Sequence, residues 1–258
     1  MFKKIRIGIL LLILVIVSGN AWLTGLRTTD WDIYLETVIY PVNGDGSAVA
    51  SDYISSLEVD DFKPVANFIA SEGESYQLEL LEPINIELAP EVGALPPPPP
   101  FGGGMMDIML WSLKMRWWAW RADTYDGPID IRIFVLYYDP ANHKELGHSL
   151  GLKEGLICMV NAFADYRHAP GNNVIIAHEL LHTLGATDKY DPQTELPIFP
   201  DGFADPQQQP LYPQRRAEIM GGLIMAEDDK GKMPPGLSRT VIGPLTAAEV
   251  GWVVEEEE

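Results

Sequence analysis

The most informative stretch of the chain covers residues 172–191 and reads NNVIIAHELLHTLGATDKYD. Its apolar side chains recur at helical spacing, as expected for a helix that buries one side: Val174, Ile175, Ala177, Leu181 and Leu184. Asn172 or Asn173 can cap the first turn, and Gly185 can end the helix because glycine tolerates a left-handed backbone. We therefore predict a buried helix that stops at Gly185.

Two histidines and a glutamate lie on this predicted helix. His178 and His182 are four residues apart, so one lies a turn above the other on the same face. Two imidazole nitrogens placed in this way can bind one zinc ion at about 2.0–2.1 Å each. Glu179 follows the first histidine directly, so its carboxylate lies beside the metal and can accept a proton from a metal-activated water. An apolar helix gains nothing from burying these side chains unless something pairs with them.

A hydrolytic zinc site needs a third protein ligand and one open coordination position. If Gly185 ends the helix three residues after His182, the chain can reverse and bring the carboxylate of Asp188 to the metal. Glu195 or Glu218 would take this place if the loop folded differently. We predict that Asp188 completes the ligand set begun by the two histidines.

The pattern His-Glu-x-x-His-x-x-Gly-x-x-Asp resembles the zincin metallopeptidases, and within them the metzincin-like branch in which aspartate replaces the usual third histidine. The resemblance covers residues 174–191. It implies an α/β (α+β) fold, with a zincin-like mixed sheet and an active-site helix. It also implies a methionine turn beneath the metal, for which Met220 in residues 217–222 is the expected residue and Met225 the competing one.

The resemblance also implies how a substrate would bind. In metzincin-like enzymes the substrate lies extended along an edge strand just upstream of the active-site helix, and residues 148–159 are the region expected here. Such binding uses main-chain hydrogen bonds and gives little side-chain specificity. Tyr190 and Tyr212 are candidates to donate a hydrogen bond to a developing oxyanion.

We therefore expect a zinc-dependent metalloendopeptidase, a hydrolase in which Glu179 acts as general base in peptide-bond cleavage. Two alternatives fit the same residues. One is a non-catalytic zinc-binding module for assembly at a membrane; a structural site needs no base, so the presence of Glu179 favours the enzyme. The other is a zinc hydrolase of a non-protein amide, such as a cell-wall peptide. The sequence carries no signature of an oligomeric state.

Residues 1–27 have the features of a signal peptide or signal anchor. A basic cluster, Lys3, Lys4 and Arg6, precedes an uncharged stretch over residues 7–26. A helix of that length would span the roughly 30 Å hydrocarbon layer, so we expect a transmembrane anchor. Small residues near its end leave cleavage and secretion as the alternative. Either way the rest of the chain is expected on the non-cytoplasmic side, periplasmic or extracellular.

Residues 28–258 are predicted to form a single mixed α/β domain. Strands are expected within residues 31–42, 76–88, 129–138 and 152–163, and helices within 47–57, 62–70, 105–122 and 244–252, the last capped by Thr246. A Pro/Gly-rich loop near residues 94–104 contains five consecutive prolines and favours an extended segment. The predicted helix at 105–122 carries three tryptophans close together, and they cannot all point inward. Core packing explains most of them, and the rest could contact a membrane surface or line a substrate cleft.

The charge and cysteine content exclude some functions. The net charge is −19, so the chain is expected to repel phosphate backbones and anionic lipid head groups, and nucleic acid is not an expected partner. The single cysteine, Cys158, cannot form an internal disulfide, and its apolar neighbours predict a buried small hydrophobe.

An acidic loop follows the predicted helix and makes calcium a second candidate cofactor. Its acidic residues are Asp188, Asp191, Glu195, Asp201 and Asp205. Their spacing matches no known calcium loop, so we expect a solvated loop instead. The three remaining histidines, His143, His148 and His168, lie in polar stretches and are predicted at the surface.

Overall fold

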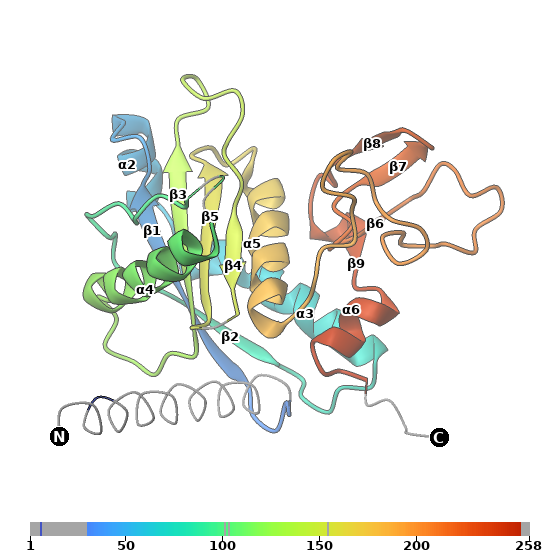
Figure 1. Ribbon diagram of the computed structural model, residues 1–258, viewed down its shortest axis with the longest axis horizontal. Helices are drawn as coiled ribbons and strands as arrows, with labels where there is room; N and C mark the ends of the chain where they lie inside the picture. The colour runs from blue at the N-terminus through green and yellow to red at the C-terminus, as the bar shows by residue number, and fades with distance from the viewer. Residues whose placement is uncertain (1–5, 7–29, 101, 103, 154, 254–258) are drawn as a thin grey trace.

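In the computed structural model, five strands form a central sheet in the order β2-β1-β3-β5-β4 (Figure 1). Four are parallel: β1 (Leu35–Asn43), β2 (Ile84–Leu88), β3 (Ile131–Tyr138) and β5 (Ile157–Phe163). β4 (Leu150–Leu152) lies at the edge and is antiparallel to β5. Nearly every residue of β3 and β5 is buried, as expected for strands covered on both faces. The prediction of a mixed α/β fold is confirmed, with a mostly parallel sheet.

The structure describes residues 6, 30–100, 102, 104–153 and 155–253. The expected signal or anchor segment, residues 1–27, lies outside these residues apart from Arg6. Within the described part of the chain, no helix combines the length and the apolar character needed to cross a membrane.

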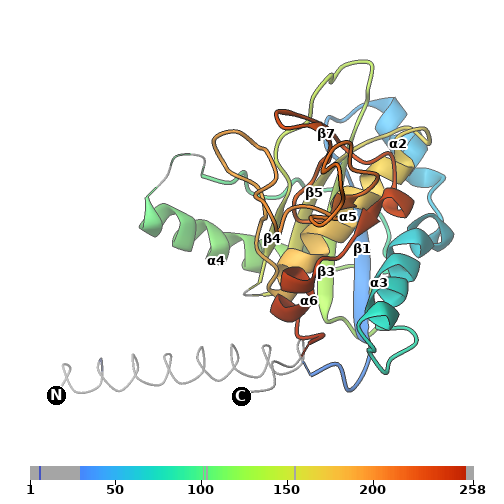
Figure 2. The same ribbon diagram turned by 90° about the vertical axis from the view of Figure 1, so that its right-hand side faces the viewer.

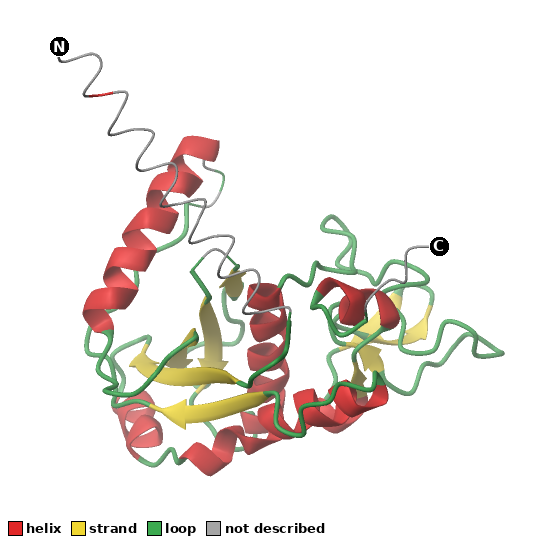
Figure 3. Cartoon of the chain, turned by 90° about the horizontal axis from the view of Figure 1, so that it is seen from below, coloured by secondary structure: helices red, strands yellow, loops and turns green. Residues whose placement is uncertain are grey.

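Helices cover both faces of the sheet, because neighbouring residues of a strand point to opposite sides. On β3, Ile133 belongs to a core shared with three helices that precede the C-terminal part of the chain, and Phe134 belongs to a core shared with a fourth. The three helices are α2 (Ala48–Ser55), α3 (Lys63–Ser75) and α5 (Ala169–Leu184). The fourth is α4 (Met105–Ala122), which extends away from the rest of the molecule in Figure 2. Seen from below in Figure 3, α4 and α5 lie on either side of the strands.

The chain after α5 forms two small sheets and a helix (Figure 1). β6 (Ala217–Glu218) pairs in parallel with β9 (Thr240–Val241), and β7 (Ile224–Glu227) pairs with β8 (Lys230–Lys232). α6 (Pro244–Glu249) follows. Two short 3-10 helices, η1 (Val59–Phe62) and η2 (Leu237–Arg239), precede α3 and β9.

Two tryptophans join the beginning and the end of the described domain. The Nε1 of Trp31 donates a hydrogen bond of 2.8 Å to the carbonyl of Val250. The ring of Trp31 also packs edge-on against that of Trp252, with 6.0 Å between ring centres. The segment before β1 therefore holds the chain just after α6 against the core.

Two predicted helix caps are wrong. α5 begins at Ala169 with Pro170 in its first turn, so Asn172 and Asn173 lie inside the helix. Their side chains bond to other segments instead: Asn172 pairs with the backbone of Phe163, and Asn173 donates to the carbonyl of Asp61. Likewise Gly243 occupies the cap position of α6, and Thr246 is buried inside it.

The strand predicted over residues 76–88 is only partly correct. α3 continues to Ser75, beyond the expected helix end at 70, and β2 begins only at Ile84. Pro83 immediately precedes β2, where a residue without an N–H does not interrupt the ladder of hydrogen bonds. The alternating leucines before it, Leu78 and Leu80, instead pack against the main core from a loop.

Candidate metal centre

α5 places the two motif histidines on one face, as its sequence predicts. Most of its residues are buried, and it ends at Gly185, whose φ of 114° is left-handed. The N–H of Gly185 donates to the carbonyl of His182, which satisfies one of the open carbonyls at the helix end. The backbone can then turn back toward the histidines.

Three ligand atoms converge at this point. The Nε2 atoms of His178 and His182 are 3.1 Å apart, and Oδ1 of Asp188 lies 3.3 Å from the first and 3.1 Å from the second. Ligand atoms of a tetrahedral zinc ion bound at 2.0–2.1 Å lie about 3.3 Å from one another. The triangle therefore has the dimensions of one face of a tetrahedral site, with the fourth position left for another group.

Backbone carbonyls hold both imidazole rings in place. Nδ1 of His178 lies 3.0 Å from the carbonyl of Ile219, and Nδ1 of His182 lies 2.8 Å from that of Ala186. A carbonyl only accepts, so each Nδ1 carries the proton and each Nε2 presents a lone pair. Two such lone pairs and a carboxylate oxygen that point at one another repel unless a cation lies between them. The donor set fits a metal ion, and the residues that could hold one are His178, His182 and Asp188.

A network behind Asp188 fixes the loop that carries it. Lys189 is buried, and its Nζ donates to Glu249 on α6 at 2.6 Å and to Thr187 at 2.8 Å. The backbone N–H and hydroxyl of Thr187 donate to the same Glu249 carboxylate. The residues on both sides of Asp188 are thus tied to α6. We call Thr187, Lys189 and Glu249 the loop clamp.

The electrostatics of Asp188 match a ligand role. Partial burial would raise the pKa of its carboxyl group, but the adjacent imidazoles of His178 and His182 outweigh that effect and hold the pKa well below its usual range. The carboxylate is therefore charged at neutral pH.

Glu179 is buried beside the ligand triangle, with 6% of its surface exposed. Its Oε2 has no hydrogen-bond partner among the described residues. Burial raises the pKa of this carboxyl group, while the nearby His178 and His182 act in the opposite direction. A buried carboxylate without a partner costs stability.

The predicted methionine turn lies under the histidines. Met220 is fully buried in the main core, and the residue before it supplies the carbonyl that contacts His178. Glu218 stabilises this turn: its carboxylate accepts from the backbone of Gly221 and Gly243 and from the hydroxyl of Thr246. Those bonds hold Glu218 away from the ligand triangle, so it does not act as the alternative third ligand. Met225 lies in the β7–β8 hairpin instead.

A cavity of about 290 Å³ opens beside His178. Tyr190 and Glu195 line it, together with His148. Burial and the neighbouring charge of Asp188 raise the pKa of Tyr190 to about 12, so its hydroxyl keeps its proton and can donate. Tyr212 lies elsewhere, and its hydroxyl donates to Asp228 at 3.1 Å.

His148 is the site residue that the sequence does not identify. It is exposed, as predicted, but it lines the cavity beside His178 and lowers the pKa of Glu179 by its proximity. The available signal was its position two residues before β4, in the region expected to form the substrate-binding edge. The other two histidines lie outside this cavity: His143 is 3.4 Å from Asp45, and His168 is exposed.

β4 packs closely against α5. A Cβ on Gly151 would lie 2.6 Å from the carbonyl of Glu179 and 2.7 Å from the Cβ of His182, which is too close for any side chain. Cys158 on the neighbouring strand is buried, as predicted, and its sulfur lies 3.3 Å from the carbonyl of Glu179. The edge strand is therefore in direct contact with the part of α5 that carries the motif.

The acidic loop does not gather its carboxylates. Among the described residues, the group of three or more acidic, histidine or cysteine side chains within reach of one ion is His178, His182 and Asp188. Asp191 accepts hydrogen bonds from the backbone of Gln193 and Thr194, as in a turn.

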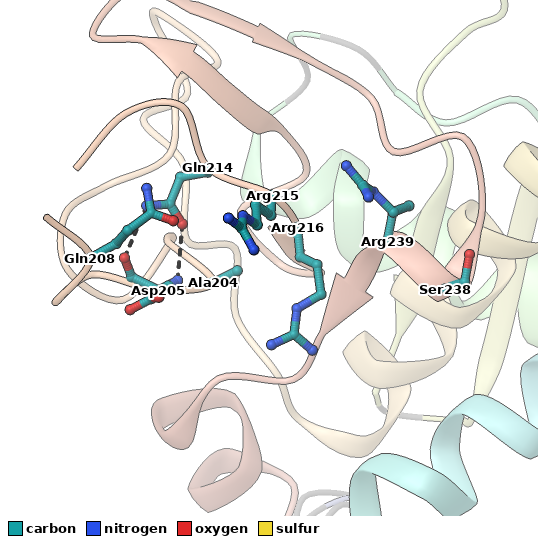
Figure 4. Close-up of a pocket in the computed structure, with 8 residues that line it drawn as sticks. All are labelled: Ala204, Asp205, Gln208, Gln214, Arg215, Arg216, Ser238 and Arg239. Atoms are coloured by element: carbon teal, nitrogen blue, oxygen red, sulfur yellow. Dashed lines mark hydrogen bonds between the residues drawn. The ribbon is translucent and has the colours of Figure 1, made fainter. Parts of the chain in front are cut away.

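A second cavity, of about 410 Å³, lies in the C-terminal part of the chain and is lined by Arg215, Arg216 and Arg239 (Figure 4). The three guanidinium groups point in different directions in Figure 4. Gln214 also lines this cavity. Its side-chain oxygen accepts from the N–H of Asp205, and its side-chain nitrogen donates to the carbonyl of Asp205. This cavity contains none of the candidate metal ligands.

No protein-family model matches the chain, and no curated protein matches it either.

Proposed function

We propose that this chain is a zinc-dependent metalloendopeptidase with a zincin-like, metzincin-related fold. The observation that carries the proposal is the buried Glu179 carboxylate, which has an oxygen without a partner among the described residues. It lies beside three convergent ligand atoms on a helix with the His-Glu-x-x-His spacing. A structural metal site needs the ligands but has no use for a buried base next to them.

Three further features support the zincin-like fold. The sheet ends in a short antiparallel edge strand, β4, packed on the motif helix. Gly185 reverses the chain after the second histidine, and the buried Met220 follows the carbonyl that holds His178. These are the parts that the sequence motif leads one to expect around such a site.

Each residue has a definite task in the proposed reaction. His178, His182 and Asp188 would hold zinc, which supplies Lewis acidity that polarises a carbonyl and lowers the pKa of water toward about 7. Glu179 accepts a proton from the attacking water and passes it to the leaving amine nitrogen. Tyr190, which keeps its proton, donates to the oxyanion that develops on the carbonyl.

The proposed substrate is an extended peptide. The free edge of β4 offers main-chain donors and acceptors next to the cavity that contains His178. With the export signal expected in residues 1–27, we propose that cleavage takes place outside the cytoplasm, on a chain that is anchored or secreted.

The decisive experiment is Glu179→Gln in the full chain, assayed on a peptide library with and without a chelator. Loss of the general base should lower turnover by about 10²–10⁴-fold, while metal analysis still finds close to one zinc per chain. Glu227→Gln is the matched control, since Glu227 forms an exposed pair with Lys230. Retained turnover in Glu179→Gln would overturn the mechanism. A wild-type chain that binds zinc and cleaves no library peptide would favour the non-catalytic module or a non-protein amide substrate.

A further inference from the structure

Helix α4 exposes an unusual amount of apolar surface. Of its eighteen residues, Trp111, Met115 and Ala119 are the buried ones, and they form the stripe that packs on the sheet. The side opposite this stripe is also apolar. Six residues make it up, each between 49% and 72% exposed: Met106, Met109, Leu110, Leu113, Trp117 and Trp120. We call these six the outer face of α4.

The outer face is a continuous helical stripe. Its residues follow the spacing i, i+3, i+4, i+7, i+11 and i+14, which keeps them on one side of a helix with 3.6 residues per turn. At about 1.5 Å per residue the stripe is about 21 Å long. In Figure 2 this helix extends away from the body of the molecule, so no described element covers it.

Basic residues lie along one margin of the stripe. At about 100° per residue, Lys114 and Arg121 fall there, and the Arg121 guanidinium lies over the Trp117 ring, 5.1 Å from its centre. Arg116 falls on the other margin, but its Nε is buried. Asp107, near the helix start, is the one acidic residue of α4. The helix is therefore locally basic in a chain whose net charge is −19.

We propose that the outer face of α4 lies in the interface of a bilayer that contains anionic lipids. Methionine, leucine and tryptophan side chains would enter the boundary between headgroups and acyl chains, and the flanking cations would contact lipid phosphates. Tryptophan favours this depth because its ring is amphipathic. The negative charge elsewhere on the chain does not oppose this contact strongly, because charges more than about 8–10 Å from the lipid are screened by physiological salt.

The same charges argue against a second copy of the chain as the occupant. In a two-fold symmetric pair, the same surface patch is used twice. Lys114 and Arg121 of one copy would then lie near those of the other, and Asp107 alone is available on α4 to offset them. Anionic headgroups complement both cations at once.

α4 and α5 pack on opposite faces of the sheet. Contact of the outer face with lipid therefore leaves the cavity beside His178 open to solvent. The proposal needs neither the metal nor catalysis, so its test is independent of the proposed function.

The test uses the full chain carrying an environment-sensitive fluorophore on Leu113→Cys. Ser71→Cys is the matched control, because Ser71 is exposed on α3 behind the other face of the sheet. Unsubstituted chain gives the labelling blank, since Cys158 is buried. The label is measured with vesicles of phosphatidylcholine alone, and of equal parts phosphatidylcholine and phosphatidylglycerol, each with a nitroxide-bearing lipid as quencher. The label reports insertion only at its own position. Membrane attachment through residues 1–27 alone would therefore not quench a fluorophore at position 113.

We expect quenching at position 113 in the anionic vesicles, little in the neutral ones, and none at position 71 in either. Lys114→Gln combined with Arg121→Gln should lower the ratio of inserted to exposed label by more than about tenfold, since each cation near a charged surface contributes about fivefold. A label at 113 that stays exposed to water in both vesicles would overturn the proposal. A label that is already shielded without lipid, in a chain that runs as a dimer, would assign the face to a second copy instead.

Discussion

Asp188 is the least enclosed of the three candidate ligands. Its side chain is 38% exposed, against 16% for His178 and 19% for His182. The histidines are held by a helix and by carbonyls, whereas Asp188 depends on a loop. The identity of the third ligand is therefore the most direct test of the site at the scale of single residues.

Asp188→Asn should weaken zinc binding by more than the roughly 10–100-fold that changes outside the ligand set produce. The amide has nearly the same shape, but it lacks the charge that balances the metal and is a much poorer ligand. Competition titration with a chromophoric chelator measures the change.

The matched control for Asp188→Asn is Glu195→Gln, because Glu195 lines the cavity beside His178 and is the alternative third ligand in this loop. Its zinc affinity should stay within about threefold of the wild type, the factor by which single interactions vary with context. If Glu195→Gln loses zinc and Asp188→Asn keeps it, the loop binds in the alternative way and the ligand set is wrong.

The sequence identifies the residues whose spacing is local. Two histidines four apart and a glycine that stops the helix are enough to predict the triangle, because one helix and one turn position all three ligands. His148 escapes this reasoning because its place in the cavity depends on the packing of β4 against α5. The hydroxyl of Tyr212, the other candidate oxyanion donor, bonds to Asp228, a contact that no local pattern reveals.

At the scale of elements, α6 supports the loop between α5 and the rest of the C-terminal chain. Glu249 at its end accepts two hydrogen bonds from Thr187, one from its backbone N–H and one from its hydroxyl, and a third from Nζ of Lys189. Lys189 is almost fully enclosed, with 5% of its side chain exposed. This pair is therefore less screened by solvent than a surface ion pair.

Glu249→Gln should weaken zinc binding by about 10-fold, because the carboxylate that positions both neighbours of Asp188 is lost. It should also lower the free energy of unfolding by about 1–3 kcal/mol, since the buried ammonium of Lys189 loses its charged partner. Calorimetric zinc titration and denaturant unfolding measure the two effects separately.

A second substitution separates positioning from stability. Glu249→Gln with Lys189→Met removes the unpaired charge and should recover stability, while zinc affinity stays low. Glu227→Gln, which breaks an exposed pair, should change neither quantity measurably. Recovery of zinc affinity along with stability would show that the loop clamp has only a structural role.

Most elements of the fold follow from the sequence, but some of their ends do not. The apolar spacing of the sequence predicts both the buried parallel strands and helix α4. The start of α5 is hidden because Asn172 and Asn173 resemble caps yet bond to distant backbone. Residues 76–83 resemble a strand because leucines that pack from a loop can alternate as strand residues do.

At the scale of the whole molecule, the candidate site lies where α5 meets the C-terminal part of the chain. The histidines belong to α5, and the carbonyl of Ile219 that orients His178 belongs to the turn directly after β6. Asp188 belongs to the loop between them. A bound ion would therefore add a further link between α5 and the C-terminal part, which already share a core, and would stabilise the folded state as a whole.

Removal of the metal should lower the melting temperature. At a free zinc concentration about 100 times the dissociation constant, binding contributes about 2.7 kcal/mol, which corresponds to about 5–10 °C in a domain of this size. Differential scanning calorimetry with and without a chelator measures the shift. Asp188→Asn should melt at the same temperature in both conditions, and an equal chelator effect on that variant would mean that the ion binds elsewhere.

The loop clamp also has a bearing on when the site is completed during synthesis. Glu249 lies 60 residues after Lys189 along the chain. Because a domain emerges from the ribosome with its N-terminal part first, His178, His182 and Asp188 are all made well before the carboxylate that fixes their loop. The hydrogen bond from Trp31 to the carbonyl of Val250 is a second contact of this kind, because Val250 is made 219 residues later. A nascent chain thus carries the motif without its support, and the finished geometry is delayed until nearly the whole domain is present.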